Sequence, residues 1–157
     1  MPASKTNGAV VTASTGGAVP LPFHRVVLSA SGSLAVLLSA ARIVLLKLNS
    51  SSSSDAPAVL GVLSCPITVP SLPYASRLPC LPRHAAISPD ERLLAIVGDD
   101  KILHVWDIAA AIESSSQPLE QGKQVLVRLL PKRANVLFWE ATSKHVVVGD
   151  RAGDVRV

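Results

Sequence analysis

The sequence predicts an all-β chain built from about three copies of one sheet unit, and three observations support this. Apolar residues make up 48% of the 157 residues, and they fall into short runs of strand length between polar turns. One plan of strand, polar turn, strand, polar connection and strand recurs over 25–48, 84–108 and 135–157. Ala35, Ala95 and Val146 take equivalent places in it, 60 and 51 residues apart. Such repeats are typical of a β-propeller, whose blades need about 40–45 residues each.

Each copy centres on a polar turn, with the sequences SASGS at 29–33, SPDER at 88–92 and EATSK at 140–144. In the second copy, Pro89 favours the φ angle that the second position of a tight turn requires, and Asp90 tolerates the next position. The runs LAVLL, LLAIV and HVVVG follow these turns as second strands. A third strand of alternating character closes each copy.

Longer segments separate the copies and predict surface loops at 49–82 and 109–123. The first contains the serine run 50–54 and a proline-rich stretch, and proline is confined to edges and loops because it lacks a ladder donor. The second contains further serines and a proline, with room for one short helical turn. We expect residues 1–22 to form a flexible segment and residues 23–157 an incomplete propeller.

The composition excludes several classes of protein. The most membrane-like stretch, Leu34–Leu48, is short of the ~20 residues of a spanning helix and carries two cations. Cys65 and Cys80 lack the close pairing of a zinc or redox site, which favours reduced thiols. The net charge of +4 comes from scattered cations, and the densest group is Arg128, Lys132 and Arg133. This charge is compatible with RNA association and equally with an ordinary soluble surface.

No motif for catalysis, cofactor binding or metal binding occurs, so we expect no catalytic, cofactor or metal residue. Asp99 and Asp100 are adjacent on a strand end and should point to opposite sides, which suits a turn better than acid–base chemistry. The four histidines are His24, His84, His104 and His145, and none has a carboxylate or cysteine partner at ligand spacing. We expect His104 to point outward or pack at the sheet edge.

The second copy resembles a WD repeat. Asp100 precedes an alternating strand that ends in the dipeptide Trp106-Asp107. In that family the equivalent of Asp100 caps the turn, and the Trp-Asp dipeptide closes the strand. The usual Gly-His dipeptide about two dozen residues earlier is missing, so the family's Asp–His–Ser–Trp hydrogen-bond chain is incomplete. The resemblance therefore implies a partial WD-repeat β-propeller of about three blades.

The C-terminal part narrows the resemblance. Pro131-Lys132-Arg133 leads into an apolar strand, and a second apolar strand then ends in Gly149-Asp150-Arg151-Ala152-Gly153-Asp154-Val155. Over about half of the chain, from residue 83 to 157, this series resembles the WD-repeat non-catalytic subunit of eukaryotic tRNA (guanine-N7)-methyltransferase. The sequence departs from that family at Ala152 and at Arg156.

The resemblance implies a protein without a catalytic centre that binds and stabilises a separate S-adenosylmethionine-dependent methyltransferase. On this interpretation the complex forms 7-methylguanosine in tRNA, in the nucleus, and no cofactor is bound by the propeller itself. Lys132 and Arg133 would contribute to the partner or RNA face, with a solvated loop as the alternative. Asp100, Trp106, Asp107 and Asp150 would be structural WD-repeat residues, and Asp150 and Asp154 turn caps. A general WD-repeat interaction adaptor without a tRNA role remains the alternative function.

The length is short for a closed propeller, which has typically four to eight blades. At about 40–45 residues per blade, the chain supplies about three and a half units. The third copy stops before any Trp-Asp position. We therefore expect this sequence to be the opening part of a larger, truncated propeller.

Overall fold

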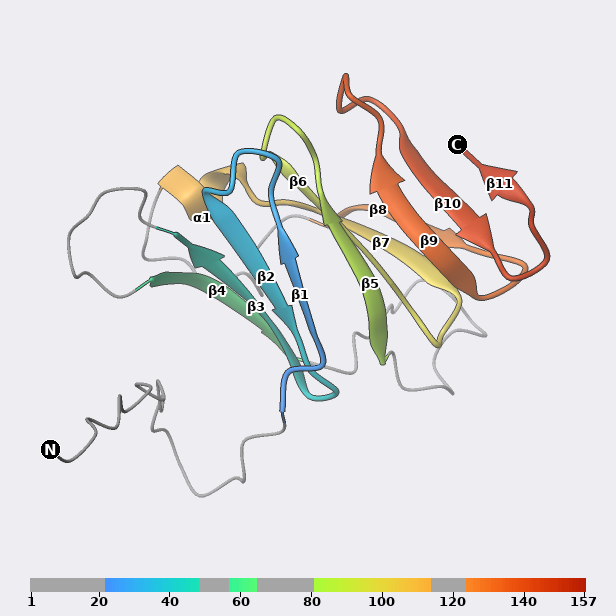
Figure 1. Cartoon of the computed structure of the whole chain (residues 1–157), viewed down its shortest axis with the longest axis horizontal. Coiled ribbons are helices and arrows are strands. Elements are labelled where there is room, and N and C mark those ends of the chain that lie inside the picture. Colours follow the sequence, from blue (N-terminus) through green and yellow to red (C-terminus); the bar gives the residue numbers. More distant parts are fainter. Residues whose placement is uncertain (1–21, 49–56, 65–80, 114–123) are drawn as a thin grey trace, which may run out of the picture.

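The computed structural model describes residues 22–48, 57–64, 81–113 and 124–157. These residues form three antiparallel sheets that stand side by side in chain order (Figure 1). All neighbouring strands within a sheet are consecutive in sequence, so each sheet is a simple meander.

The first sheet has four strands and is closed by a strand that the sequence analysis assigned to a loop. Its order is β1 (Arg25–Leu28), β2 (Leu34–Leu38), β3 (Arg42–Lys47) and β4 (Ala58–Ser64). The prediction of a loop over 49–82 is therefore wrong for 58–64, whereas 49–56 and 65–80 lie outside the described residues. Strand β4 was missed because it lies between a serine run and a proline-rich stretch and contains Gly61. It forms because Leu60 and Leu63 are buried in the core.

The second sheet also has four strands and is the most deeply buried. Its order is β5 (Pro82–Ile87), β6 (Leu93–Gly98), β7 (Ile102–Asp107) and β8 (Gln124–Leu129). Between β7 and β8 lies α1 (Ala109–Glu113), a single helical turn within the predicted loop. Strands β6 and β7 are buried along nearly their whole length, because sheets pack on both of their faces.

The third sheet has three strands in the order β11-β10-β9. These strands are β9 (Ala134–Trp139), β10 (Val146–Asp150) and β11 (Val155–Arg156). Exposed apolar side chains are frequent here, including Val136 on β9 and Val155 on β11. The all-β class predicted from the sequence is confirmed.

The same turn joins the first two strands of every sheet. Backbone amides of Ser29, Ser88 and Glu140 each donate to the carbonyl five residues later, on Leu34, Leu93 and His145. The fourth residue of each turn has a positive φ: 75° at Gly32, 59° at Glu91 and 62° at Ser143.

This turn alignment corrects the repeat register. Leu34, Leu93 and His145 are equivalent, so Ala35 corresponds to Leu94 rather than to Ala95. The register is not evident from the sequence, because β6 is apolar at nearly every position. A strand buried on both faces lacks the alternation that would fix its register.

Two apolar cores lie between the sheets. The larger core joins the first and second sheets and also receives Ala111 of α1. The smaller core joins the second and third sheets through Ala95, Val97 and Val148, among others. Each core is built from one face of two adjacent sheets, the arrangement of neighbouring propeller blades.

Strands β1, β5 and β9 lie next to one another, β1 against β5 and β5 against β9. Side chains bridge these strands at both junctions. The Nε2 atom of His24 lies 3.0 Å from the carbonyl oxygen of Pro82, and Trp139 Nε1 donates to the carbonyl of Ala86 at 3.0 Å. These three strands place the polar cleft described next.

No helix in the described ranges is long and apolar enough to cross a membrane. The two cysteines and the predicted flexible segment, apart from Pro22, lie outside the described residues.

Candidate functional site

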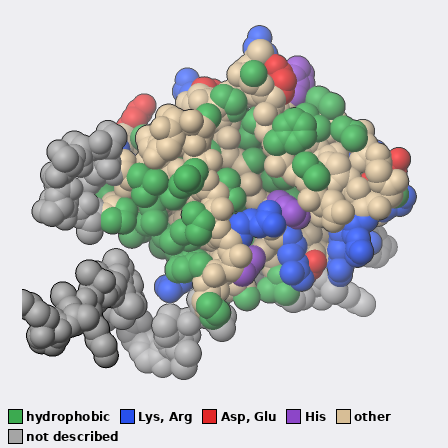
Figure 2. Space-filling view, in the orientation of Figure 1, with side chains coloured by type: hydrophobic (Ala, Val, Ile, Leu, Met, Phe, Trp, Pro, Cys, Tyr) green, Lys and Arg blue, Asp and Glu red, His purple; other side chains and the backbone are tan. Residues whose placement is uncertain are grey.

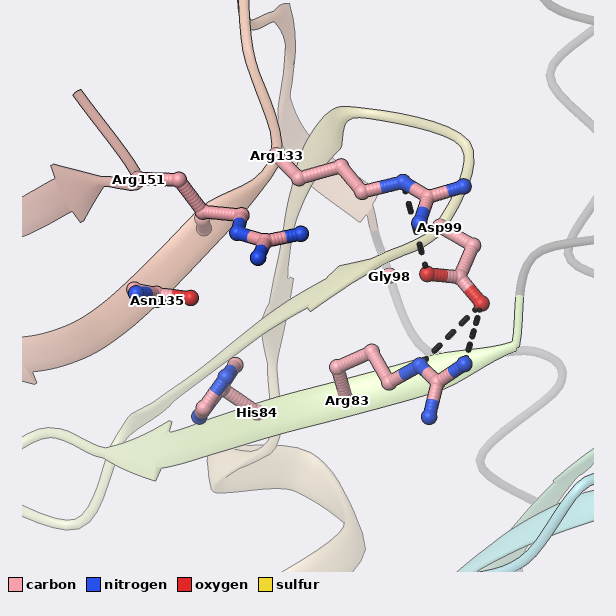
Figure 3. Close-up of a pocket in the computed structure, with 8 residues that line it drawn as sticks. Arg83, His84, Gly98, Asp99, Arg133, Asn135 and Arg151 are labelled. Atoms are coloured by element: carbon pink, nitrogen blue, oxygen red, sulfur yellow. Dashed lines mark hydrogen bonds and ion pairs between the residues drawn. The ribbon is translucent and has the colours of Figure 1, made fainter.

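A polar cleft of about 270 Å³ opens between the second and third sheets (Figure 3). It lies at the beginnings of β5 and β9 and at the hairpins that follow β6 and β10. We call it the inter-sheet cleft. Its lining is Arg83, His84, Gly98, Asp99, Arg133, Ala134, Asn135 and Arg151.

One carboxylate and three guanidinium groups set the charge of the inter-sheet cleft. Two nitrogens of Arg83, Nη2 and Nε, donate to Asp99 Oδ2 at 2.7 and 3.1 Å. The Nε atom of Arg133 lies 3.7 Å from the other oxygen of Asp99. Hydrogen bonding from Arg83 lowers the pKa of Asp99, against an opposing effect of burial, and the same bond raises the pKa of Arg83. Asp99 is therefore a carboxylate at neutral pH.

The two walls of the cleft are built from equivalent positions of consecutive sheets. The amide of Asp99 donates to the carbonyl of Leu81 at 3.1 Å, and the amide of Arg151 donates to that of Arg133 at 3.3 Å. Asp99 and Arg151 thus take the same place in the second and third sheets. The carboxylate of one sheet is replaced by a guanidinium in the next.

The same alignment makes Arg83 and Asn135 equivalent. In the second sheet this pair of positions holds an ion pair, Arg83 with Asp99. In the third sheet it holds Asn135 and Arg151, which cannot form one. Within the described part of the chain, no hydrogen bond or ion pair is found for the guanidinium of Arg151. Figure 3 shows its side chain reaching into the cleft beside Asn135.

His84 contributes a neutral ring to the cleft. Arg25 Nη1 lies 2.7 Å from His84 Nδ1. Because a guanidinium only donates, Nδ1 must accept, which leaves the proton of the neutral ring on Nε2. Burial lowers the pKa of His84, and the charges of Arg25 and Arg83 lower it further. At neutral pH His84 is therefore an uncharged N–H donor.

The cleft belongs to a basic region of the surface. Figure 2 shows Lys and Arg side chains, with histidines among them, gathered over the lower middle and right of the viewed face. The lining has three guanidinium groups and one carboxylate, so it carries a net positive charge. Such a region attracts anions at a range set by the ionic strength.

His104 is the clearest correction to the sequence analysis. It was expected to point outward or pack at an edge without a carboxylate partner. Its side chain is fully buried, and its Nε2 lies 2.9 Å from Asp100 Oδ2. Gln124 Nε2 lies 3.0 Å from the other ring nitrogen, and the ring stacks on Trp106 with centroids 5.4 Å apart. His104 and Trp106 share a strand face, and β7 is covered on both faces.

The other predicted structural residues lie at separate places. Asp107 Oδ1 accepts from the amide of Ala109 at 3.0 Å, at the start of α1. Asp150 Oδ1 accepts from the amides of Ala152 and Asp154, at 2.8 and 3.2 Å, within the β10–β11 turn. The second carboxylate oxygen of Asp150 is buried and has no partner among the described residues.

Of the two predicted interface residues, only Arg133 reaches the inter-sheet cleft. Lys132 is exposed and lies 3.7 Å from the carboxylate of Asp154. Sequence reasoning missed Arg83, His84, Asn135 and Arg151. A residue-by-residue alignment of the turns after the second strands would have shown that Asp99 and Arg151 occupy equivalent positions of the repeat. Arg83 and His84 give no local signal, because their neighbours lie far away in sequence.

No known family model matches this chain, and a search of curated proteins finds no match. Solved structures do match. The chain aligns with the β-propeller domain of Cps50 (Swd1) from Myceliophteria thermophila with a TM-score of 0.60 and 13% identity, over 83% of this chain and 36% of that one. It also aligns with a putative 6-phosphogluconolactonase from Bacteroides fragilis, with a TM-score of 0.55 and 11% identity, over 82% and 32% of the two chains.

A third similar structure is the hydrazine synthase of Kuenenia stuttgartiensis, with a TM-score of 0.54 and 14% identity, over 91% of this chain and 33% of that one. The chain thus spans about a third of the length of the structures that it matches. At this identity the likeness concerns the fold alone. The chain has the fold of part of a β-propeller, and its three sheets correspond to blades.

Proposed function

We propose that this chain belongs to a non-catalytic propeller subunit that binds a catalytic tRNA (guanine-N7)-methyltransferase in the nucleus. The observation that carries the proposal is the meeting of Arg133 and Arg151, because the amide of Arg151 donates to the carbonyl of Arg133. Both residues come from the C-terminal series that resembles this family. The two ends of that series form one basic surface at the inter-sheet cleft.

The physical basis of the proposed role is conformational selection. A surface held by two packed cores can bind one conformation of a mobile partner. Binding only the active conformation shifts the partner's population toward it. Lys132 and Arg133, exposed on the connection between β8 and β9, would contact the partner or the tRNA backbone.

The proposal is tested by replacing both cations with glutamate in the gene of the source organism. We expect Lys132→Glu with Arg133→Glu to lower 7-methylguanosine in tRNA and to reduce recovery of the methyltransferase with the tagged protein. Lys47→Glu with Lys144→Glu is the matched control, since both lysines are exposed and neither lines the cleft. Normal tRNA methylation after complete loss of the gene would reject the proposal.

A second candidate is a general interaction adaptor with no tRNA role. Exposed apolar side chains on β8 and β9 favour it, since such patches mark protein contacts. These include Val125, Leu129, Val136 and Phe138. The adaptor function predicts that Phe138→Lys disrupts the recovered complexes, whereas tRNA methylation does not change.

A further inference from the structure

We propose that the inter-sheet cleft binds a phosphate-type oxyanion, between Arg151 and Asn135 of the third sheet and Arg83 and His84 of the second. This inference goes beyond the proposed function and does not depend on it. The ligand is defined by its chemistry, a tetrahedral oxyanion with at least one negative charge. A free phosphate and a phosphate of an RNA backbone both satisfy this description.

The charge balance of the cleft supports the inference. Asp99 is the single carboxylate in the lining, and it is already engaged by Arg83 and approached by Arg133. No carboxylate among the described residues engages the guanidinium of Arg151. Three guanidinium groups against one carboxylate leave two uncompensated positive charges for an anion.

The donors also suit an oxyanion. Arg151 offers a guanidinium, which forms paired hydrogen bonds to phosphate oxygens. Asn135 offers an amide N–H group from the neighbouring strand. His84 carries its ring proton on Nε2, since its Nδ1 accepts from Arg25. A neutral histidine donates to the anion without a change of protonation.

The internal repeat makes the arrangement more than a chance cluster of cations. At the same two positions, the second sheet compensates Arg83 with Asp99. The third sheet keeps a hydrogen-bonding side chain, Asn135, and replaces the acid by Arg151. The two sheets can therefore be compared directly: the arginine of the second sheet has a carboxylate partner, and the arginine of the third sheet has none among the described residues.

The cleft is large enough for such a ligand and its water. Its volume of about 270 Å³ is far above the ~10–15 Å³ that one water requires. The cleft is open to solvent, and a phosphate group can enter without rearrangement of the sheets. Figure 3 shows Arg151 and Asn135 on one side of the cleft and His84 on the other, with Arg83 and Arg133 turned toward Asp99.

The test is a titration of the full 157-residue chain with inorganic phosphate at low ionic strength, followed by ¹H–¹⁵N NMR including arginine side-chain signals. We expect saturable shifts at Arg83, Asn135 and Arg151. Arg151→Gln should weaken phosphate binding about five- to tenfold, the loss of one charge-assisted contact near a solvated surface. Asp99→Asn should strengthen binding about threefold or more, because it removes the competing carboxylate.

The matched control is Arg156→Gln, which removes the same charge outside the cleft lining and should change the affinity less than about twofold. Circular dichroism of each variant establishes that the sheets form. Absence of saturable shifts at Arg83 and Arg151 would overturn the inference. An equal loss of affinity in Arg156→Gln and Arg151→Gln would also overturn it, since only net charge would then matter.

A second arm separates the two phosphate sources. An unstructured RNA oligonucleotide is titrated under the same conditions, and inorganic phosphate is then added. If RNA shifts the same signals and phosphate displaces it, a backbone phosphate occupies the cleft. If RNA leaves these signals unchanged while phosphate shifts them, the ligand is free phosphate or a small phosphorylated molecule. Both results support the site.

Discussion

At the scale of single residues, the second sheet is organised around a buried polar pair. The Asp100 side chain accepts the Nε2–H of His104 at 2.9 Å and the amide of Ile102 at 3.3 Å. Both side chains are almost completely buried. Since buried polar groups are costly without partners, the pair stabilises the sheet only while both members remain.

Replacement of Asp100 should therefore be strongly destabilising. We expect Asp100→Ala to lower the free energy of unfolding by about 2–3 kcal/mol, because buried donors of His104 and Ile102 lose their acceptor. Asp107→Ala is the matched control, and it should cost about 0.5–1 kcal/mol because it removes one partly exposed contact. Urea unfolding monitored by tryptophan fluorescence measures both. Equal losses in the two variants would contradict the role of the buried pair.

His84 predicts a pH dependence of stability. Its pKa in the folded state is below the ordinary value of 6.5, because burial and two arginines disfavour the charged ring. The unfolded chain therefore binds a proton more readily as the pH falls. The free energy of unfolding should decrease as the pH falls below about 6.5 and level off below the folded-state pKa.

His84→Gln should remove this part of the pH dependence, and urea unfolding between pH 5 and 7.5 measures it. Acidic residues with a lowered pKa, such as Asp99, change the stability at lower pH, near and below 3.8. They therefore do not obscure the histidine effect. If the free energy of unfolding depends on pH in the same way in His84→Gln, a group other than His84 is responsible for that dependence.

At the scale of secondary-structure elements, one hairpin conformation recurs in the second and third sheets. The hairpins after β6 and β10 each place their fourth residue at positive φ, Lys101 at 60° and Gly153 at 89°. This conformation suits glycine and is unfavourable for lysine. Lys101 is exposed, so no contact of its side chain offsets the strain.

Glycine at this position should stabilise the second sheet. We expect Lys101→Gly to raise the free energy of unfolding by about 0.5–1 kcal/mol, the relief of left-handed strain less the added freedom of the unfolded chain. Gly153→Ala, at the equivalent position of the third sheet, should lower it by about 1 kcal/mol. Thermal unfolding of both variants gives the comparison. If the free energy of unfolding changed in the same direction in both variants, Lys101 and Gly153 would not be equivalent positions of the repeat.

Much of this local architecture could be predicted from the sequence. The polar turns at 29–33, 88–92 and 140–144 were placed correctly, because Gly, Pro, Ser and Asp there interrupt apolar runs. Strand β4 was missed, since its flanking serines and prolines predicted a loop. The cleft was largely missed because Arg83, Asn135 and Arg151 meet only through pairing between distant segments.

At the scale of the whole molecule, adjacent sheets are joined by repeated side-chain contacts at their turns as well as by their cores. Glu91 of the second sheet is hydrogen-bonded by Ser31 and Ser33 of the first. The equivalent residue of the third sheet, Ser143, accepts from the amide of Asp90. Each sheet thus reaches back to the turn of the preceding one, and the contact advances along the row of sheets.

The outer face of the third sheet predicts self-association. Val136 and Phe138 are about half exposed on β9. Exposed apolar side chains that lie close together favour contacts between molecules. We expect Val136→Lys with Phe138→Lys to reduce concentration-dependent association of the 157-residue chain, measured by sedimentation velocity.

Thr142→Lys with Ala141→Lys is the control for this prediction, because it adds the same charge in an exposed turn without removing apolar surface. If the control reduces association as much as the β9 variant, net charge rather than the apolar face is responsible.

The equivalence of Asp99 and Arg151 has a consequence for how such a protein can change over evolutionary time. Both residues sit in hairpins whose backbone hydrogen bonds do not depend on side-chain charge. An exchange of acid for base at this position alters which ligands the surface attracts, and the strands that hold the hairpin are unaffected. Selection can therefore act on recognition at one hairpin per blade while the packed interior stays under separate constraint.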